Sequence, residues 1–210
     1  MSHSSNDQKE KEDSASPYSR PALIVWDMQY GMAVQSFNFK DVVSNIRFLI
    51  DGAHASHVPV IYSQYTGLPY ELMNNYLIYW AMKRGMDPKR PRLPEGSHDW
   101  QIIEELTPSP DRGDVVLKKH TASLFVGTYF EGILHNLRIN SLILTGVSTE
   151  IGIETTARHA SCLGFIPIIA RDAVGSPNKD LHEISLRVMS GMFELETTQN
   201  IIQKLQNRMG

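Results

Sequence analysis

Three segments of this sequence carry side chains that could do chemistry. Asp27 ends an apolar run that begins at Ala22, Lys118 and Lys119 end a second apolar run, and a Gly-Val-Ser-Thr-Glu run begins at Gly146. A carboxylate at the end of a buried strand is costly to desolvate unless it is paired or protonated. Asp27 is therefore a candidate general acid or base, with a turn or helix-cap aspartate as the alternative.

The lysine pair and the glycine run each have a functional and an ordinary interpretation. Neighbouring residues on a strand point to opposite faces, so at most one of Lys118 and Lys119 enters a site, and both could be solvated lysines at a strand end. Backbone N–H groups at the helix start after Gly146 could stabilise an anion, or the run could be an ordinary strand–helix turn.

The elements that must position these segments alternate between strands and helices. This alternation predicts crossover units and a three-layer α/β/α fold with a mainly parallel, Rossmann-like sheet of about six strands. Ligands of such sheets bind beyond the carboxyl ends of the strands, which is where all three segments lie. Strands are predicted at 22–26, 59–63, 115–117, 141–147, 166–170 and 193–196, and helices at 41–57, 71–82, 128–137, 150–163 and 178–193.

Composition favours a single globular domain. The chain has 210 residues, 41% of them apolar, and a formal net charge of −3, which indicates no binding to nucleic acid or to an anionic membrane. No apolar run approaches the roughly 20 residues of a membrane span. A polar stretch at 1–19 predicts a disordered tail before a domain at 20–210. The single cysteine fits a reducing, cytoplasmic location.

The three segments, at their spacing, resemble the signature blocks of the isochorismatase-like (cysteine hydrolase) superfamily. The first block ends in an aspartate, here Asp27. The second is a lysine followed by Ser-x-Phe, which places the lysine at Lys119. The third is a Gly-Val-x-Thr run leading into a helix and followed by Ala-Arg-Asp-Ala, here at 146–149 and 157–160, where His159 stands in place of the aspartate. The resemblance spans about residues 21–205.

This resemblance implies an Asp, Lys and Cys triad and a cis peptide bond between Val147 and Ser148. The position of the nucleophilic cysteine is Gly152, which has no side chain to attack with. Cys162 does not replace it, because ten residues of helix span about 15 Å.

The glycine at this position is shared with the isochorismatases proper, which cleave a vinyl ether. The resemblance of this chain to those enzymes implies that Asp27 acts as an acid, Lys119 orients groups or stabilises charge, and no covalent intermediate forms. The bond cleaved could be a vinyl ether or a C–N bond attacked by water. Two alternatives stay open: an inactive family member that binds a ligand or partner, and replacement of a native cysteine by engineering.

Substrate contacts are expected at Gln64, which matches a glutamine of the isochorismatases, and at Trp80, His120 and Glu150. The Trp80 segment could instead pack in the core or at a subunit contact, and His120 could be an exposed strand-end residue. The segment after the second strand lacks the Asp-x-His of the nicotinamidases, so we predict no catalytic metal and no cofactor. The substrate is expected to be a small molecule, and the resemblance implies a homo-oligomer, a dimer or a tetramer.

Overall fold

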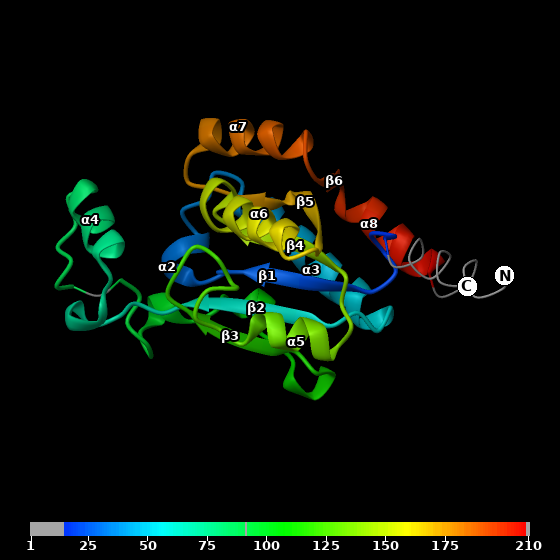
Figure 1. The fold of residues 1–210 in the computed structure, drawn as a ribbon, viewed down its shortest axis with the longest axis horizontal. Helices are drawn as coiled ribbons and strands as arrows, with labels where there is room; N and C mark the ends of the chain where they lie inside the picture. Colours follow the sequence, from blue (N-terminus) through cyan, green and yellow to red (C-terminus); the bar gives the residue numbers. More distant parts are fainter. Residues whose placement is uncertain (1–14, 91, 209–210) are drawn as a thin grey trace, which may run out of the picture.

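The computed structural model describes residues 15–90 and 92–208, and its centre is a six-stranded parallel sheet (Figure 1). The strand order is β3-β2-β1-β4-β5-β6, with every neighbouring pair parallel. The predicted three-layer, Rossmann-like fold is thus confirmed. The strands are β1 (Pro21–Trp26), β2 (Val60–Tyr65), β3 (Val115–Lys119), β4 (Ser141–Val147), β5 (Ile166–Gly175) and β6 (Glu194–Glu196).

Helices cover both faces of the sheet. One face packs against α3 and α8, and the other against α5, α6 and α7 (Figure 1). The helices are α2 (Tyr30–Ala33), α3 (Phe39–Ala55), α4 (Asn75–Lys83), α5 (Phe130–Asn136), α6 (Glu154–Cys162), α7 (Lys179–Ser190) and α8 (Thr198–Asn207).

Side-chain periodicity explains this layering. In β1, Leu23 and Val25 belong to one core cluster while Ile24 and Trp26 belong to the other, as the two-residue repeat of a strand requires. In the sheet, the strands that follow β1 in sequence, β2 and β3, lie on one side of it, whereas β4, β5 and β6 lie on the other side. The switch point between β1 and β4 is therefore where a ligand site is expected.

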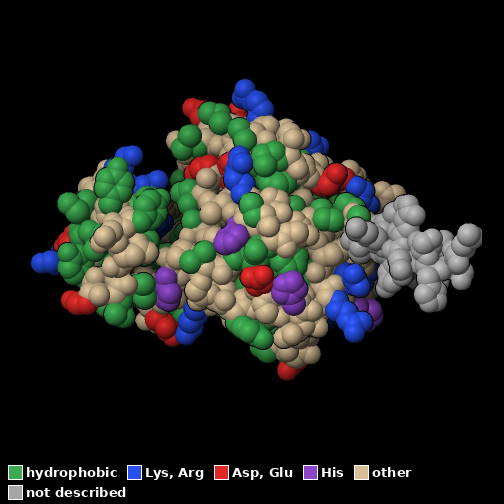
Figure 2. Space-filling view, viewed as in Figure 1, with side chains coloured by type: hydrophobic (Ala, Val, Ile, Leu, Met, Phe, Trp, Pro, Cys, Tyr) green, Lys and Arg blue, Asp and Glu red, His purple; other side chains and the backbone are tan. Residues whose placement is uncertain are grey.

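The helix α4 lies in a lobe that stands apart from the body of the molecule (Figures 1 and 2). Asn74 starts it by accepting a hydrogen bond from Leu77 N at 2.9 Å. This cap explains why the helix begins at residue 75 and not at 71, as the pattern predicted. Tyr76 and Tyr79 are exposed, so core packing, one of the alternatives for this aromatic segment, does not describe them.

The predicted tail at 1–19 lies mostly outside the described residues. Its described part, 15–19, forms turns, and Tyr18 packs against the core with the Lys204 ammonium 5.0 Å from its ring centroid. Tyr18 therefore has apolar surface that α8 helps to cover, and the domain boundary at residue 19 stays a prediction. Within the described ranges no helix is both long and apolar enough to cross a membrane.

Candidate active site

The carboxyl edge of the sheet brings Asp27 and Lys119 into a buried ion pair. Lys119 Nζ lies 2.6 Å from Asp27 Oδ2, and each side chain is only 2% exposed. Asp27 has a φ of 46°, a left-handed conformation that aspartate tolerates better than most residues. Lys118 instead points outward and pairs with Glu95, so Lys119 is the lysine that enters the site.

Ser63, at the end of β2, is the third member of this cluster and was missed by the sequence analysis. Its hydroxyl donates to Asp27 Oδ1 at 2.6 Å and accepts from Asp27 N at 3.1 Å. Ser63 is paired with Trp26 in the β1–β2 register, one residue before Asp27. The β1–β2 register is therefore the observation that indicates Ser63 as a neighbour of Asp27.

Burial lowers the pKa of Lys119, while the attraction of Asp27 works in the opposite direction. The ammonium also donates to Thr121 O at 3.1 Å and lies 4.4 Å from the centroid of the Trp26 ring. An ionised carboxylate has about four acceptor positions, and the two contacts to Ser63 and Lys119 leave room for water or substrate.

The segment after β4 supplies the backbone wall of the site. The Val147–Ser148 peptide bond is cis, and a π-helical turn at Thr149–Ile153 precedes α6. The Gly152 N–H donates to Ser148 O at 3.0 Å, so it is not a free donor as the sequence suggested. The Ser148 N–H finds no acceptor within the described part of the chain.

A cavity of about 360 Å³ opens above these groups, between the α4 lobe and the body. Figure 2 shows the separation of the lobe from the body. The body contributes Asp27, Lys119, Ser148 and Gly152 to its lining, and the lobe contributes Trp80. A volume of this size suits a small molecule.

Three of the four predicted substrate-contacting residues line this cavity: Trp80, His120 and Glu150. His120 Nδ1 lies 2.6 Å from Thr66 O and must carry the hydrogen of that contact. Glu150 accepts from Ser176 Oγ at 3.0 Å, and its second oxygen is buried without a partner in the described residues.

Gln64 was predicted to contact substrate, but the structure places it elsewhere. Its side-chain amide donates to Trp100 O at 3.0 Å, and it is not part of the cavity wall. Gln64 pairs with Lys118 in the β2–β3 register, whereas its neighbour Tyr65 pairs with Lys119 and lines the cavity. The alternation of side chains along β2 therefore turns Gln64 away.

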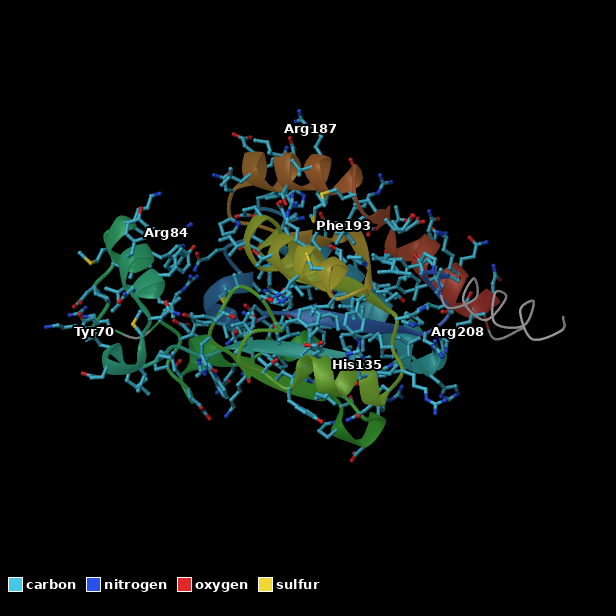
Figure 3. All side chains as sticks on the ribbon, in the orientation of Figure 1. Tyr70, Arg84, His135, Arg187, Phe193 and Arg208 are labelled. Carbon is cyan, nitrogen blue, oxygen red and sulfur yellow. The ribbon has the colours of Figure 1, made fainter. Side chains whose placement is uncertain are left out.

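Two arginines line the cavity, Arg84 at the end of α4 (labelled in Figure 3) and Arg92 in the following loop. Their guanidinium groups lie 4.3 and 5.7 Å from the Trp80 ring centroid. Burial lowers the pKa of Arg92, although an arginine keeps its charge. Neither has a carboxylate partner among the described side chains. From the sequence, Arg84 was a residue that could reach in from the aromatic segment, whereas Arg92 was missed, because a loop residue has no periodicity to reveal its direction.

The loop that carries Arg92 is held against β2 by a close backbone approach. Gly67 N donates to Leu93 O at 3.2 Å, and a Cβ on Gly67 would lie 2.0 Å from Arg92 O. Only glycine permits this contact. Among residues 15–90 and 92–208, no group of three or more His, Cys, Asp or Glu is placed to hold a metal ion.

This fold, with its buried acid–base pair at the carboxyl edge of the sheet, defines an α/β enzyme with a small-molecule cavity. The isochorismatase domain model matches residues 21–200, and the chain belongs to the isochorismatase family of hydrolases. The predicted superfamily and hydrolase class are confirmed.

Relatives and solved structures agree with this assignment. N-carbamoylsarcosine amidase of Arthrobacter sp. is 29% identical over 89% of this chain and 71% of its own length. Ureidoacrylate amidohydrolase of Pseudomonas syringae pv. syringae is 27% identical over 84% of this chain and 77% of its own. A cysteine hydrolase from Pseudomonas syringae pv. phaseolicola superposes with a TM-score of 0.76 at 25% identity, covering 90% of this chain and 93% of the other.

Proposed function

We propose that this hydrolase cleaves the C–N bond of a carbamoyl or ureido group in a small carboxylate, with water as the nucleophile. The observation that carries the proposal is the buried Asp27–Lys119 pair, which faces the cavity beside a glycine and not beside a nucleophilic side chain. The names of both curated relatives denote small carboxylates that carry a carbamoyl or ureido group.

Asp27 is the group proposed to move the proton. As a carboxylate it takes a proton from the attacking water while the water oxygen bonds to the carbonyl carbon. When the C–N bond breaks, Asp27 returns that proton to the leaving nitrogen and acts as the acid. Lys119 holds the carboxylate in place and balances its charge, and Ser63 orients its other oxygen.

The proposed carboxylate subsite is the pair of guanidinium groups of Arg84 and Arg92. Guanidinium groups bind carboxylates through two parallel hydrogen bonds, and the partial burial of Arg92 strengthens the attraction. Trp80 lies against both groups and limits their movement. The cavity thus places a cationic end in the α4 lobe and the proton-transfer pair in the body.

Vinyl ether hydrolysis, with Asp27 as the initial proton donor, is the second candidate, and Gly152 is the observation in its favour. It requires a proton on Asp27 before the reaction starts, and a neutral Asp27 would lose its ion pair with the Lys119 ammonium 2.6 Å away. The geometry therefore favours C–N hydrolysis.

The test is a turnover assay with N-carbamoylsarcosine, ureidoacrylate, N-carbamoylglycine and isochorismate. We expect release of ammonia from an N-carbamoyl or ureido acid, and loss of at least about 100-fold in kcat for Asp27→Asn. Lys118→Ala is the matched control, since Lys118 neighbours Lys119 but faces solvent, and it should keep full activity. Turnover of isochorismate alone would select the vinyl ether candidate, whereas binding of these acids without turnover would identify an inactive family member.

A second comparison tests the carboxylate subsite. N-carbamoylglycinamide has the same carbamoyl group as N-carbamoylglycine but no carboxylate. We expect Arg92→Gln to raise KM for the acid about 10-fold or more and to leave the neutral amide unaffected. An equal effect on both compounds would contradict the proposed role of Arg92.

We further propose that the protein is cytoplasmic and acts as a homo-oligomer. Tyr79 and Met82 on α4 and Ile184 and Val188 on α7 are exposed apolar side chains, and a second copy would cover them. Light scattering coupled to size exclusion would measure the mass, and a monomer at micromolar concentration would contradict this proposal.

A further inference from the structure

The space directly above Gly152 is filled by the side chain of Trp26. A Cβ built on Gly152 would lie 2.0 Å from Trp26 Nε1, 2.4 Å from Cε2 and 2.8 Å from Cζ2. Real Cβ atoms do not approach other atoms this closely. The edge of the indole that carries the N–H therefore occupies the position that a side chain at residue 152 would need.

The indole is fixed from several sides and cannot easily swing away. Trp26 is 1% exposed and packs in the core cluster with Ile24 and Ile153. The Lys119 ammonium lies 4.4 Å from its ring centroid, a distance at which a cation is attracted to the ring face. The same ammonium is bound to Asp27, so the ring, the cation and the carboxylate form one connected unit.

The N–H of this indole is available to a ligand. Trp26 lines the cavity, and its Nε1 makes no hydrogen bond with the described part of the chain. Trp100 provides the contrast, since its Nε1 donates to Thr66 Oγ1 at 2.9 Å. A buried indole N–H normally has a partner, and an unused one at a cavity wall is a donor for what the cavity binds.

We propose that Trp26 is a substrate-contacting residue, which takes the place of a side chain at residue 152 and donates its indole N–H to an acceptor oxygen of the bound substrate. This inference rests on the proposed function for the identity of the acceptor, which would be the oxygen of the carbamoyl carbonyl. Hydrogen-bond donors aimed at an oxygen that gains charge accelerate its reaction. The packing part of the proposal depends only on Trp26 and Gly152.

The packing part is tested without any substrate, in a Cys162→Ser background that removes the exposed native thiol. Gly152→Cys should lower the melting temperature by more than 5 °C, because its side chain and the indole cannot share one space. Trp26→Ile combined with Gly152→Cys should recover at least half of that loss, relative to Trp26→Ile alone, and should expose a thiol that iodoacetamide labels. A Gly152→Cys variant that melts like its parent would overturn the inference.

The hydrogen-bond part is tested with ¹⁵N-labelled indoles. The chain has three tryptophans, so each N–H resonance is assigned by its Trp→Phe variant. On addition of N-carbamoylglycine the Trp26 signal should shift while the Trp100 signal stays in place. Trp26→Phe, which keeps an aromatic ring but lacks the N–H, should bind the compound about 10-fold more weakly. A bound ligand that moves only the Trp80 signal, with unchanged affinity in Trp26→Phe, would refute the contact.

Failure of the proposed function gives a different result from failure of this inference. If none of the carbamoyl compounds binds the parent protein, the proposed function fails, and the Gly152→Cys and double-variant melts still decide whether the indole occupies the space at residue 152.

Discussion

Replacing Lys119 by methionine is expected to destabilise the protein far more than the same change at Lys118. Lys119→Met keeps the length of the side chain but leaves Asp27 buried and without its cation. Breaking a buried ion pair by removing one partner costs about 3–5 kcal/mol. For a chain of this size, 1 kcal/mol shifts the melting temperature by about 2–4 °C, so we expect a fall of roughly 6–20 °C.

Lys118→Met is the matched control for this measurement. Its ion pair with Glu95 is about half exposed, and such pairs contribute at most about 1 kcal/mol. Thermal and urea unfolding of both variants should therefore separate the two neighbours clearly. Similar small losses in the two variants would refute the buried-pair reasoning.

The pH dependence of the stability of Asp27→Asn is a second test of the same buried ion pair. Without Asp27, burial and the repulsion of Arg92 both lower the pKa of Lys119 and nothing offsets them, so this pKa in the folded protein should fall further. Below the folded pKa of Lys119, its buried charge destabilises the fold in full. This destabilisation is relieved as pH rises from the folded pKa towards the unfolded pKa of about 10.4. The stability deficit of Asp27→Asn should thus shrink from neutral to alkaline pH, and a deficit that grows would contradict the assigned direction.

Three further predictions concern residues around the site. Tyr62→Phe should stabilise the fold by about 1 kcal/mol, because the hydroxyl is buried without a partner in the described residues. Burial also raises the pKa of Tyr62, so the parent should lose stability above about pH 10, where the tyrosine of the unfolded chain ionises first. Urea titrations at alkaline pH should show a smaller loss for the variant. Gly67→Ala should displace the Arg92 loop and raise KM for the acid substrate with little change in kcat in steady-state assays. Gln64→Ala should leave KM unchanged, since Gln64 lies outside the cavity, and a raised KM would reverse that placement.

The sequence was sufficient to predict the fold, and to place Asp27 and one of Lys118 and Lys119 at the carboxyl edge of the sheet. Short apolar runs that alternate with helical patterns define a parallel sheet, and residues directly after those runs must lie at its carboxyl edge. These steps need only local information. The choice of Lys119 and its grouping with Asp27 came from the family resemblance, because local patterns do not give the strand order that brings the two together across β2.

The rest of the site depends on register and on loops, which local patterns do not determine. Gln64 and Ser63 are neighbours on β2, and only the register with β1 and β3 shows which of them faces Asp27. Arg92 reaches the cavity because its loop folds back on Gly67. Trp26 belongs to a run that predicts a buried strand, and nothing in that run indicates that its ring covers Gly152.

Stability alone does not explain the buried pair, and one variant separates stability from function. A buried ion pair often contributes less than apolar residues of the same shape, because desolvation of both charges offsets their attraction. The double variant Asp27→Asn/Lys119→Met removes both charges, so it should lose much less stability than the sum of the two single variants. Its turnover should nevertheless be at least as low as that of Asp27→Asn. A double variant that folds like the parent and keeps its activity would mean that the pair serves only packing, and the catalytic assignment of Asp27 would have to be abandoned.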